Sequence, residues 1–222
     1  MKFKDKKLLI FDLDGTLINS IPDLTHSINK MLFHYGLSQL TIEQVTPFIG
    51  NGAKTLVKRA LDKVSKSAVA PTLLDEALVV FKNTYQENVC NDTFLYPNVK
   101  QTLNYLRDEG YKLTICTNKP FKFVEPILEK LKIKEFFLLW VGEESLPEKK
   151  PEATPLLHLA KKMNVLPDQC VMIGDSKNDI LAAKNAGIDS IGLSYGYNYN
   201  ENIQDYNPEL VVDNFQNLQK VL

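Results

Sequence analysis

The sequence predicts an α/β protein: a doubly wound, Rossmann-like parallel sheet with an α-helical unit inserted after its first strand. The first observation is that short apolar runs recur along the chain and that amphipathic stretches of helical period separate most of them. This alternation is the βαβ pattern of a parallel sheet. The second observation is that residues 20–88 contain one helical pattern after another and no strand candidate. The predicted fold class therefore combines a parallel-sheet core with a helical insertion.

The strands of the core are predicted at apolar, β-rich runs. These runs cover residues 7–11, 112–116, 136–141, 171–173, 190–193 and 210–212. Apolar stripes at helical spacing lie between the runs and are expected to pack on both faces of the sheet. One stripe consists of Phe121, Val124, Ile127, Leu128 and Leu131. Another consists of Ile180, Ala183 and Ala186 and ends before Gly187, a residue type that often terminates helices.

The inserted unit is predicted to begin with a helix that Ser20 caps. The apolar face of this helix is marked by Ile21, Leu24, Ile28, Leu32 and Tyr35. The unit interrupts the chain between the first strand and the rest of the sheet. We therefore predict a discontinuous core domain of residues 1–17 and 92–222, and an inserted domain of residues 18–91 joined to it by two linkers.

The composition indicates a soluble globular protein, since 44% of the 222 residues are hydrophobic. The 26 basic and 27 acidic residues give a net charge of -1, so no general attraction to nucleic acid or to an anionic membrane is expected. The apolar stretch after the basic N-terminus ends at Asp12 and is too short for a signal peptide. Three cysteines without a CxxC spacing fit reduced thiols. We therefore expect a cytoplasmic protein.

Polar residues with catalytic potential follow three of the predicted strands. Asp12 and Asp14 follow the first, Thr117 and Asn118 follow the second, and an acidic segment of sequence GDSKND follows the run at 171–173. Ligands of a doubly wound sheet bind beyond the carboxyl ends of its strands, so we expect these side chains to surround one site. Thr117 and Asn118 would donate hydrogen bonds to an anion bound there.

Three or four carboxylates are expected to converge at this site. Asp175 and Asp179 are four residues apart where a strand gives way to a helix, so both can turn toward Asp12. Such a cluster requires a cation, and oxygen ligands without His or Cys favour Mg²⁺. A lysine from the pair Lys149 and Lys150 would neutralise charge on a phosphoryl group and on a nucleophile.

Four motifs, taken in order, resemble those of the haloacid dehalogenase-like (HAD) phosphohydrolases. They are DLDGT at residues 12–16, Thr117-Asn118, Lys150-Pro151 and GDSKND at residues 174–179. The resemblance spans nearly the whole chain and implies a parallel-sheet core with an inserted helical cap. Three further segments are similar to those of bacterial phosphoglycolate phosphatases: FIGNGA at 48–53, CTNKP at 116–120 and SYGYNY at 194–199.

The resemblance implies a role for each motif residue. Asp12 would attack phosphorus and form an aspartyl-phosphate, and Asp14 would protonate the departing alkoxide and later deprotonate the attacking water. Mg²⁺ would be held by Asp12, by the backbone carbonyl of Asp14 and by Asp175, with Asp179 acting through water. Lys150 rather than Lys149 aligns with the family lysine because Pro151 follows it directly.

The presence of Asp14 favours phosphoryl chemistry over dehalogenation, because a leaving halide needs no proton whereas an alkoxide does.

The residues Gly50, Asn51 and Gly52 precede a helical pattern, so their backbone amides are predicted to form an anion-binding helix start that selects the substrate. Lys54 or Arg59 would assist them. A carboxylate docked there would favour a small diacidic ester such as 2-phosphoglycolate.

The predicted function is therefore Mg²⁺-dependent hydrolysis of 2-phosphoglycolate, and three alternatives remain open. These are a phosphatase for another small phosphate monoester, a phosphosugar mutase, and a regulatory module that binds phosphate without turnover. The expected partner is a small phosphorylated metabolite, and the sequence does not predict the oligomeric state.

Tyr195, Tyr197 and Tyr199 are expected in an ordered surface loop rather than stacked on nucleic-acid bases, because no Arg or Lys lies between Tyr195 and Tyr206.

Overall fold

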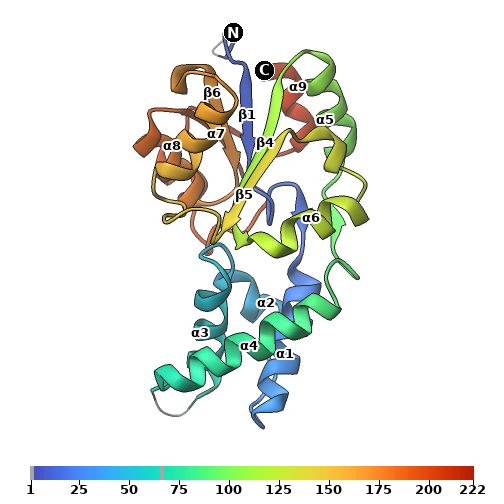
Figure 1. Ribbon diagram of the computed structural model, residues 1–222, viewed down its shortest axis with the longest axis vertical. Coiled ribbons are helices and arrows are strands. Elements are labelled where there is room, and N and C mark those ends of the chain that lie inside the picture. The colour runs from blue at the N-terminus through green and yellow to red at the C-terminus, as the bar shows by residue number, and fades with distance from the viewer. Residues whose placement is uncertain (1–2, 66–67) are drawn as a thin grey trace.

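A computed structural model describes residues 3–65 and 68–222, and its centre is a six-stranded parallel sheet (Figure 1). The strand order is β5-β4-β1-β6-β7-β8. The strands are β1 (Leu8–Phe11), β4 (Lys112–Pro120), β5 (Leu139–Glu143), β6 (Cys170–Gly174), β7 (Asp189–Leu193) and β8 (Leu210–Val212). Each lies at one of the predicted apolar runs, and all neighbouring pairs are parallel. The predicted α/β fold class is thereby confirmed.

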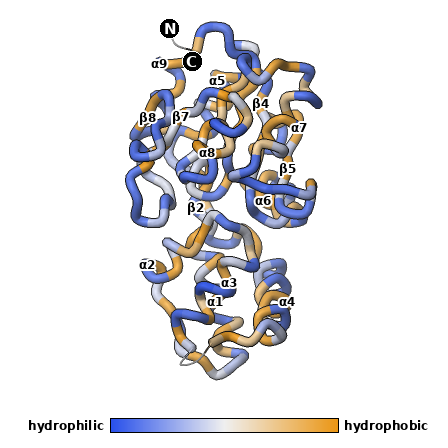
Figure 2. The backbone as a smooth tube through the Cα atoms, turned by 90° about the vertical axis from the view of Figure 1, so that its left-hand side faces the viewer, coloured by the Kyte–Doolittle hydropathy of each residue, from blue (hydrophilic) through white to orange (hydrophobic). Residues whose placement is uncertain are grey.

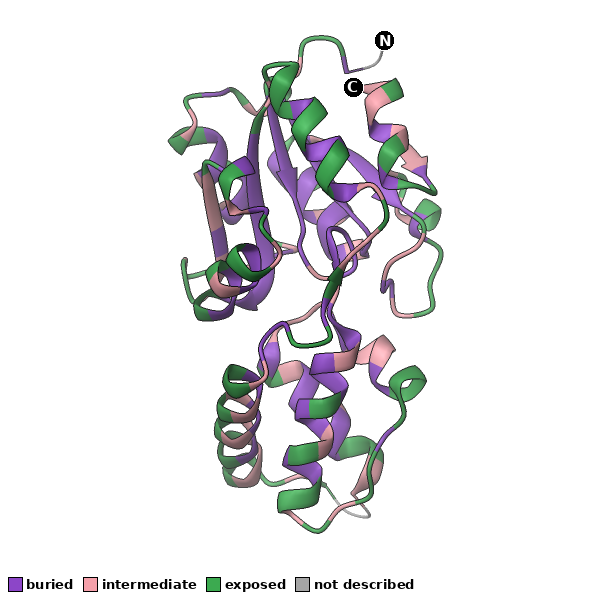
Figure 3. Ribbon diagram, turned by 90° about the vertical axis from the view of Figure 1, so that its right-hand side faces the viewer, coloured by how far each residue is buried: buried purple, intermediate pink, exposed green. Residues whose placement is uncertain are grey.

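Helices cover both faces of this sheet (Figure 1). One face carries α5 (Val99–Asp108), α6 (Phe121–Lys130) and α9 (Leu218–Val221), and the other carries α7 (Thr154–Lys162) and α8 (Lys177–Ala186). The side chains of β1 alternate between the two layers. Leu9 and Phe11 join the first hydrophobic core, whereas Leu8 and Ile10 join the second. Burial on both faces explains why the strands are continuous apolar runs (Figure 3).

The predicted helical stripes are largely confirmed. Val124, Ile127 and Leu128 of α6 are fully buried, whereas Phe121, at the first position of that helix, is exposed. Helix α8 ends at Gly187, whose φ of 66° lies in the left-handed region that glycine adopts without strain.

The order of the strands brings three strand ends together. From β1 the chain adds β4 and β5 on one side of the sheet and β6, β7 and β8 on the other. The carboxyl ends of β4, β1 and β6 are therefore neighbours at the point where the strand order reverses, which is the usual ligand site of an open α/β sheet. Those ends face the second body of the molecule (Figure 1).

This second body is the helical segment, residues 21–87, inserted between β1 and β4 (Figures 1 and 2). It consists of α1 (Ile21–His34), α2 (Ile42–Val45), α3 (Ala53–Val64) and α4 (Pro71–Glu87). Helix α4 packs against both α1 and α3 around buried side chains such as Ile28, Leu61 and Phe81. As predicted, the described part of this segment contains no strand.

Two short antiparallel strands join the helical segment to the sheet. They are β2 (Ile18–Asn19) and β3 (Phe94–Leu95). The carboxylate of Asp23 in α1 is 2% exposed and accepts hydrogen bonds from the backbone N–H groups of Asp92 and Thr93, each at 2.9 Å. The outgoing and returning connections are thus tied to each other.

Short 3₁₀ turns complete the described chain, at Thr46–Phe48, Lys134–Phe136, Pro167–Gln169, Ile203–Tyr206 and Phe215–Asn217. No helix among the described residues has the length and apolar character needed to cross a membrane.

Candidate active site

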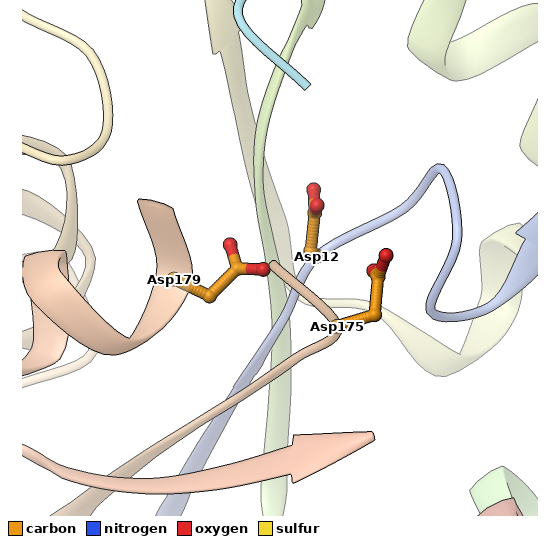
Figure 4. A group of neighbouring side chains, drawn as sticks. All are labelled: Asp12, Asp175 and Asp179. Atoms are coloured by element: carbon orange, nitrogen blue, oxygen red, sulfur yellow. The ribbon is translucent and has the colours of Figure 1, made fainter. Parts of the chain in front are cut away.

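Three buried aspartates meet at the carboxyl edge of the sheet (Figure 4). Asp12 follows β1, Asp175 follows β6, and Asp179 lies in the first turn of α8. Each offers a carboxylate oxygen, and these oxygens lie within 4.8 Å of one another. The side chains of Asp12 and Asp175 project in similar directions, and Asp179 reaches toward them from its helix (Figure 4). The convergence predicted from the strand ends is therefore observed, and we call these three residues the acidic cluster.

Glycine makes room for Asp175 on two sides. A Cβ atom placed on Gly15 or on Gly196 would lie 2.2 Å from Asp175 Oδ2. Thr16 Oγ1 donates to Asp175 Oδ1 at 2.6 Å, and the Tyr197 N–H donates to Oδ2 at 2.6 Å. This carboxylate is therefore held in one orientation by two loops of the core.

Lys150 is the cation of the acidic cluster. Its Nζ lies 2.9 Å from Asp12 Oδ1 and 2.6 Å from Asp179 Oδ1, and its side chain is 2% exposed. The other oxygen of Asp179 accepts from the N–H and the hydroxyl of Ser176, so both oxygens of Asp179 are engaged. Lys149 instead points away and pairs with Glu143 at 2.6 Å. The structure therefore places Lys150, and not Lys149, beside the predicted nucleophile.

The acidic cluster holds three carboxyl groups against one ammonium. Burial raises the pKa of Asp12 to about 7, against the opposing effect of Lys150 and with added repulsion from Asp179. Burial also raises the pKa of Asp175 well above its ordinary value, and the charges of Asp12 and Asp179 add to this. Three carboxylates share one ammonium, and their hard oxygen atoms suit a divalent cation such as Mg²⁺. The residues present therefore fit a metal ion.

Asp14 lies apart from this cluster, in a different set of contacts. Its two carboxylate oxygens accept from Lys119 Nζ at 3.0 and 3.1 Å, and Ser20 Oγ donates to Oδ1 at 2.5 Å. Ser20 occupies the N-cap position of α1, as predicted, but its side chain does not cap the helix. Its φ of -104° and ψ of 3° do not have the extended form of a capping residue, and its hydroxyl donates to Asp14 instead.

Lys119 and Tyr85 join the sheet to the helical segment beside Asp14. Lys119 Nζ lies 4.8 Å from the centre of the Tyr85 ring, which belongs to α4. Burial raises the pKa of Tyr85 to about 12, so its hydroxyl is a neutral donor. Burial alone would lower the pKa of Lys119, but Asp14 and Tyr85 outweigh it and the pKa is raised. Lys119 had no role in the sequence prediction although it directly follows Asn118, and nothing in the sequence singled out Tyr85.

A cavity of about 50 Å³ lies between the strand ends and the helical segment. Its polar lining includes four of the five predicted catalytic and phosphate-binding residues, Asp12, Asp14, Thr117 and Asn118, together with Lys119. Lys150, the fifth, and the predicted metal ligand Asp175 are not among the lining residues. The rest of its wall is largely apolar and includes Leu24, Ile49, Leu56, Phe81, Tyr85 and Phe123. A reacting group bound here would touch both bodies of the molecule.

The predicted phosphate donors differ in how far they are engaged. The two amide hydrogens of Asn118 are both used, by the carbonyl of Gly50 at 2.9 Å and by the carbonyl of Lys150 at 2.9 Å. Thr117 Oγ1 accepts from the Lys119 N–H at 3.2 Å, which leaves the Thr117 hydroxyl hydrogen for another acceptor. Asn178 also donates to the Gly50 carbonyl, at 3.0 Å. The loop before α3 is thus docked on the core.

The loop at Gly50, Asn51 and Gly52 places two of its three residues at the cavity. Gly50 and Gly52 line it, whereas Asn51 does not, and the Asn51 side chain accepts from Arg59 Nη2 at 3.0 Å. Lys54 pairs with Asp75 on an exposed surface. Neither predicted assistant of the loop, Lys54 or Arg59, is among the cavity-lining residues.

The start of α3 already contacts a carboxylate of the core. The Ala53 N–H donates to Glu143 Oε2 at 3.3 Å, and Lys149, the partner of Glu143, donates to the Asn51 carbonyl at 3.0 Å. A Cβ on Gly52 would lie 2.4 Å from Glu143 Oε1, and the φ of Gly52 is +87°. Glycine is therefore needed here for close approach to Glu143, a contact that the sequence did not indicate.

The tyrosine-rich segment is an ordered loop, as the sequence suggested, but it lies only partly at the surface: Tyr195 and Tyr199 are half-buried and Tyr197 is buried. Tyr197 is 5% exposed, and its hydroxyl accepts from the Ser20 N–H at 3.1 Å and donates to Asn19 Oδ1 at 3.0 Å. The Tyr195 hydroxyl donates to the Thr16 carbonyl at 2.8 Å. The segment therefore holds the first linker next to the site.

Comparisons with known proteins place the chain in a family. A model of the family described as haloacid dehalogenase-like hydrolase matches residues 9–193. Phosphoglycolate phosphatase of Colwellia psychrerythraea is 46% identical over 223 aligned positions, which cover 98% of this chain and 97% of that protein. Its counterpart in Haemophilus influenzae is 45% identical over 219 positions, covering 97% and 98% of the two chains.

Solved structures show the same likeness. The crystal structure of a predicted phosphoglycolate phosphatase from Haemophilus somnus is 43% identical, covers 98% of each chain and has a TM-score of 0.94. The match extends over both bodies of the molecule, since it covers nearly every residue. This chain therefore belongs to the haloacid dehalogenase-like hydrolases.

Proposed function

We propose that this protein is a Mg²⁺-dependent phosphatase that hydrolyses 2-phosphoglycolate to glycolate and phosphate through an aspartyl-phosphate on Asp12. The main observation in support is that two carboxylates only two residues apart in the sequence lie in different surroundings. Asp12 lies in the acidic cluster beside Lys150, while Asp14 lies outside it beside Lys119. Relatives about 45% identical over nearly their whole length bear the name phosphoglycolate phosphatase, which supports the choice of substrate.

In the first half-reaction, a carboxylate oxygen of Asp12 attacks phosphorus and forms an oxygen–phosphorus bond. The bond from phosphorus to the ester oxygen breaks, and that oxygen takes a proton from Asp14 as it leaves. Lys150, 2.9 Å from Asp12, orients the nucleophile and offsets negative charge on the phosphoryl group. The Thr117 hydroxyl donates to a phosphoryl oxygen, and Asn118 does so once its amide releases Gly50.

In the second half-reaction, Asp14 removes a proton from water while the water oxygen attacks the phosphorus of the aspartyl-phosphate. The bond between Asp12 and phosphorus breaks, and inorganic phosphate leaves. Asp14 regains the proton that it gave up, so the cycle is balanced. A dehalogenase has no use for this proton, and Asp14 therefore favours phosphate esters within a family named for haloacids.

We propose that Asp12, Asp175 and the backbone carbonyl of Asp14 hold Mg²⁺. Asp179 acts through water, because Lys150 and Ser176 already engage both of its oxygens. Bound Mg²⁺ supplies positive charge opposite the phosphoryl oxygens. The surplus of buried carboxylates over ammonium groups in the acidic cluster supports this assignment.

We also propose that residues 18–91 act as a cap that closes over the strand ends. The support is that Tyr85 and Phe81 of α4, and Gly50 and Gly52 of the loop before α3, share one cavity with the sheet residues. Closure would exclude water from the reacting groups. Gly50 and Gly52 would limit the substrate by closing the cavity rather than by offering free amides, since the first N–H of α3 binds Glu143.

The apolar wall of the cavity favours a leaving group with few hydroxyls. A sugar would lose hydrogen bonds of its hydroxyl groups against Leu56, Phe81 and Phe123, whereas a two-carbon acid has none to lose there. This argues for phosphoglycolate over the substrates of a phosphosugar mutase.

We place the activity in the cytoplasm because Cys90, Cys116 and Cys170 are all free.

The decisive experiment is phosphate release by the purified protein from a panel of esters in the presence of Mg²⁺. We expect 2-phosphoglycolate to give the highest kcat/KM and chelation with EDTA to abolish turnover. A higher kcat/KM on another small ester would overturn the choice of 2-phosphoglycolate as substrate but would still show a phosphatase. Transfer of the phosphoryl group between sugar positions without release would indicate a mutase, and no turnover of any ester would indicate a binding module.

A further inference from the structure

Two buried donors, one from the sheet and one from the helical segment, meet on the side of the cavity where the leaving group must lie. Lys119 Nζ makes two hydrogen bonds among the described residues, both to Asp14, although an ammonium group has three donors. Tyr85 is 1% exposed and lines the cavity. Its hydroxyl lies beside the ammonium of Lys119, which can only donate, and no described residue accepts a hydrogen bond from it. A buried hydroxyl whose hydrogen has no acceptor costs stability, so its retention calls for an acceptor that arrives from outside.

The spare donors on the cavity wall indicate what that acceptor is. Among the described residues that line the cavity, Lys119 carries the only positive charge, and Asp14 engages only part of its ammonium group. The neighbouring wall is apolar, with Phe81 and Phe123 next to Tyr85, and an apolar wall strengthens an ion pair formed against it. A carboxylate could accept from both the ammonium and the hydroxyl.

We infer that Lys119 and Tyr85 bind the carboxylate of the substrate, so that the site selects phosphate esters with a carboxylate on the carbon next to the ester oxygen. The inference rests on the proposed function and names what chooses its substrate. The inference assigns substrate selection to Lys119 and Tyr85 rather than to the loop at Gly50, Asn51 and Gly52, which the sequence analysis favoured.

The distances agree with this assignment. Asp14 must come within about 3 Å of the ester oxygen to protonate it. Lys119 Nζ lies 3.0 Å from Asp14 Oδ1, so the ammonium is within about 6 Å of the ester oxygen. One methylene separates that oxygen from the carboxylate carbon in phosphoglycolate. The carboxylate therefore reaches Lys119 while the ester oxygen stays at Asp14.

The first test compares two substrates of nearly equal size, 2-phosphoglycolate and the uncharged analogue 2-hydroxyethyl phosphate. In Lys119→Met we expect the ratio of the two kcat/KM values to fall about 100-fold, because only phosphoglycolate loses a charged hydrogen bond. Lys112→Met, at the opposite end of the same strand, is the matched control and should keep the wild-type ratio. Equal losses on both substrates would mean that Lys119 acts only on Asp14 and would overturn the inference.

Tyr85→Phe gives a second test that does not depend on a change in charge. We expect its KM for phosphoglycolate to rise about 5- to 10-fold with little change in kcat, and its melting temperature to stay nearly equal, because the buried hydroxyl has no acceptor among the described residues. A purely structural hydroxyl would lower the melting temperature and leave the ratio of the substrates unchanged. Tyr105→Phe, an exposed tyrosine on α5, is the control.

A binding measurement separates this inference from the proposed reaction. The unreactive phosphonate 3-phosphonopropionate carries the carboxylate, and propylphosphonate lacks it. By calorimetry we expect the wild type to bind the former at least about 10-fold more tightly, and Lys119→Met to lose that preference. Equal affinities in the wild type would overturn the inference even if phosphoglycolate is hydrolysed. The expected preference would uphold it even if the ester panel rejected the phosphatase.

Discussion

The two sides of the candidate site are built in different ways. The acidic cluster comes entirely from the core, and its side chains are oriented by neighbours in that core: Gly15 and Gly196 pack on Asp175, and Lys150 bridges Asp12 and Asp179. The opposite wall exists only where Lys119 of the sheet meets Tyr85 of the helical segment. If the proposed mechanism holds, the reacting groups lie in one rigid layer, whereas the choice of substrate depends on how the two bodies of the molecule come together.

The largest expected effect is on the side of the acidic cluster. Asp12→Asn should lower kcat on phosphoglycolate by at least about 10⁴-fold, because the amide cannot form the phosphoryl intermediate. Phosphate release measures the loss, and circular dichroism checks that the variant is folded. Residual activity above one per cent of the wild type, without reversion of the amide to the acid, would remove Asp12 from its role.

Asp14→Asn tests the boundary between the two sides. We expect a loss of about 10³-fold on phosphoglycolate, whose alkoxide needs a proton, and a clearly smaller loss in the first half-reaction on an aryl phosphate, whose leaving group does not. Burst kinetics on the aryl ester separate the two half-reactions. Near-normal turnover of phosphoglycolate would refute the acid–base role.

The acidic cluster should also make the metal-free protein sensitive to pH. Because the folded-state pKa of Asp12 is raised to about 7, the folded state binds more protons than the unfolded chain between about pH 4 and pH 7. Stability should therefore fall as the pH rises through this range. Relative to Asp12→Asn, the wild type should lose at least about 3 °C of melting temperature between pH 5 and pH 7.5.

Added Mg²⁺ should restore much of this loss at pH 7.5 and less at pH 5, where protons compete for the carboxylates. Differential scanning calorimetry with and without EDTA measures both effects. Parallel melting curves for the wild type and Asp12→Asn at all pH values would show that the buried charges do not oppose folding.

The smallest expected effect concerns the contact that docks the loop before α3. Glu143→Gln weakens the pair with Lys149, whose side chain is 42% exposed, so the change should be small. We expect KM to rise less than about 5-fold, and equally for phosphoglycolate and 2-hydroxyethyl phosphate. A selective loss of phosphoglycolate would return the choice of substrate to the loop at Gly50 and Gly52.

Much of the fold and the acidic cluster could be predicted because the signals are local. A strand buried on both faces must be a continuous apolar run, and β1 is one, so Asp12 at its end stands out. Parallel strands bring their carboxyl ends to one edge, which placed Asp175 and Asp179 near Asp12 without any knowledge of the connections between them. Lys150 was selected over Lys149 only through the family resemblance, because nothing local in the pair distinguishes them.

The remaining contacts could not be predicted because they join segments that are far apart in the sequence. Tyr85 lies on a face of α4 that would be buried in any helical bundle, and only the docking of that helix brings it to Lys119. Ser20 has the residue type and position of a helix cap, and the nearby charge of Asp14 redirected its hydroxyl. The first N–H of α3 was expected to be free to bind the substrate, but in the folded chain it donates to Glu143.

The central claim is that Asp12 takes the phosphoryl group before water does. The stereochemical course at phosphorus tests it most directly, using a thiophosphate analogue of phosphoglycolate whose two other non-bridging oxygens are different isotopes, hydrolysed in water that carries the third isotope. Each in-line displacement inverts phosphorus, so transfer to Asp12 followed by attack of water predicts net retention of configuration. Net inversion would mean a single direct attack by water and would contradict the account.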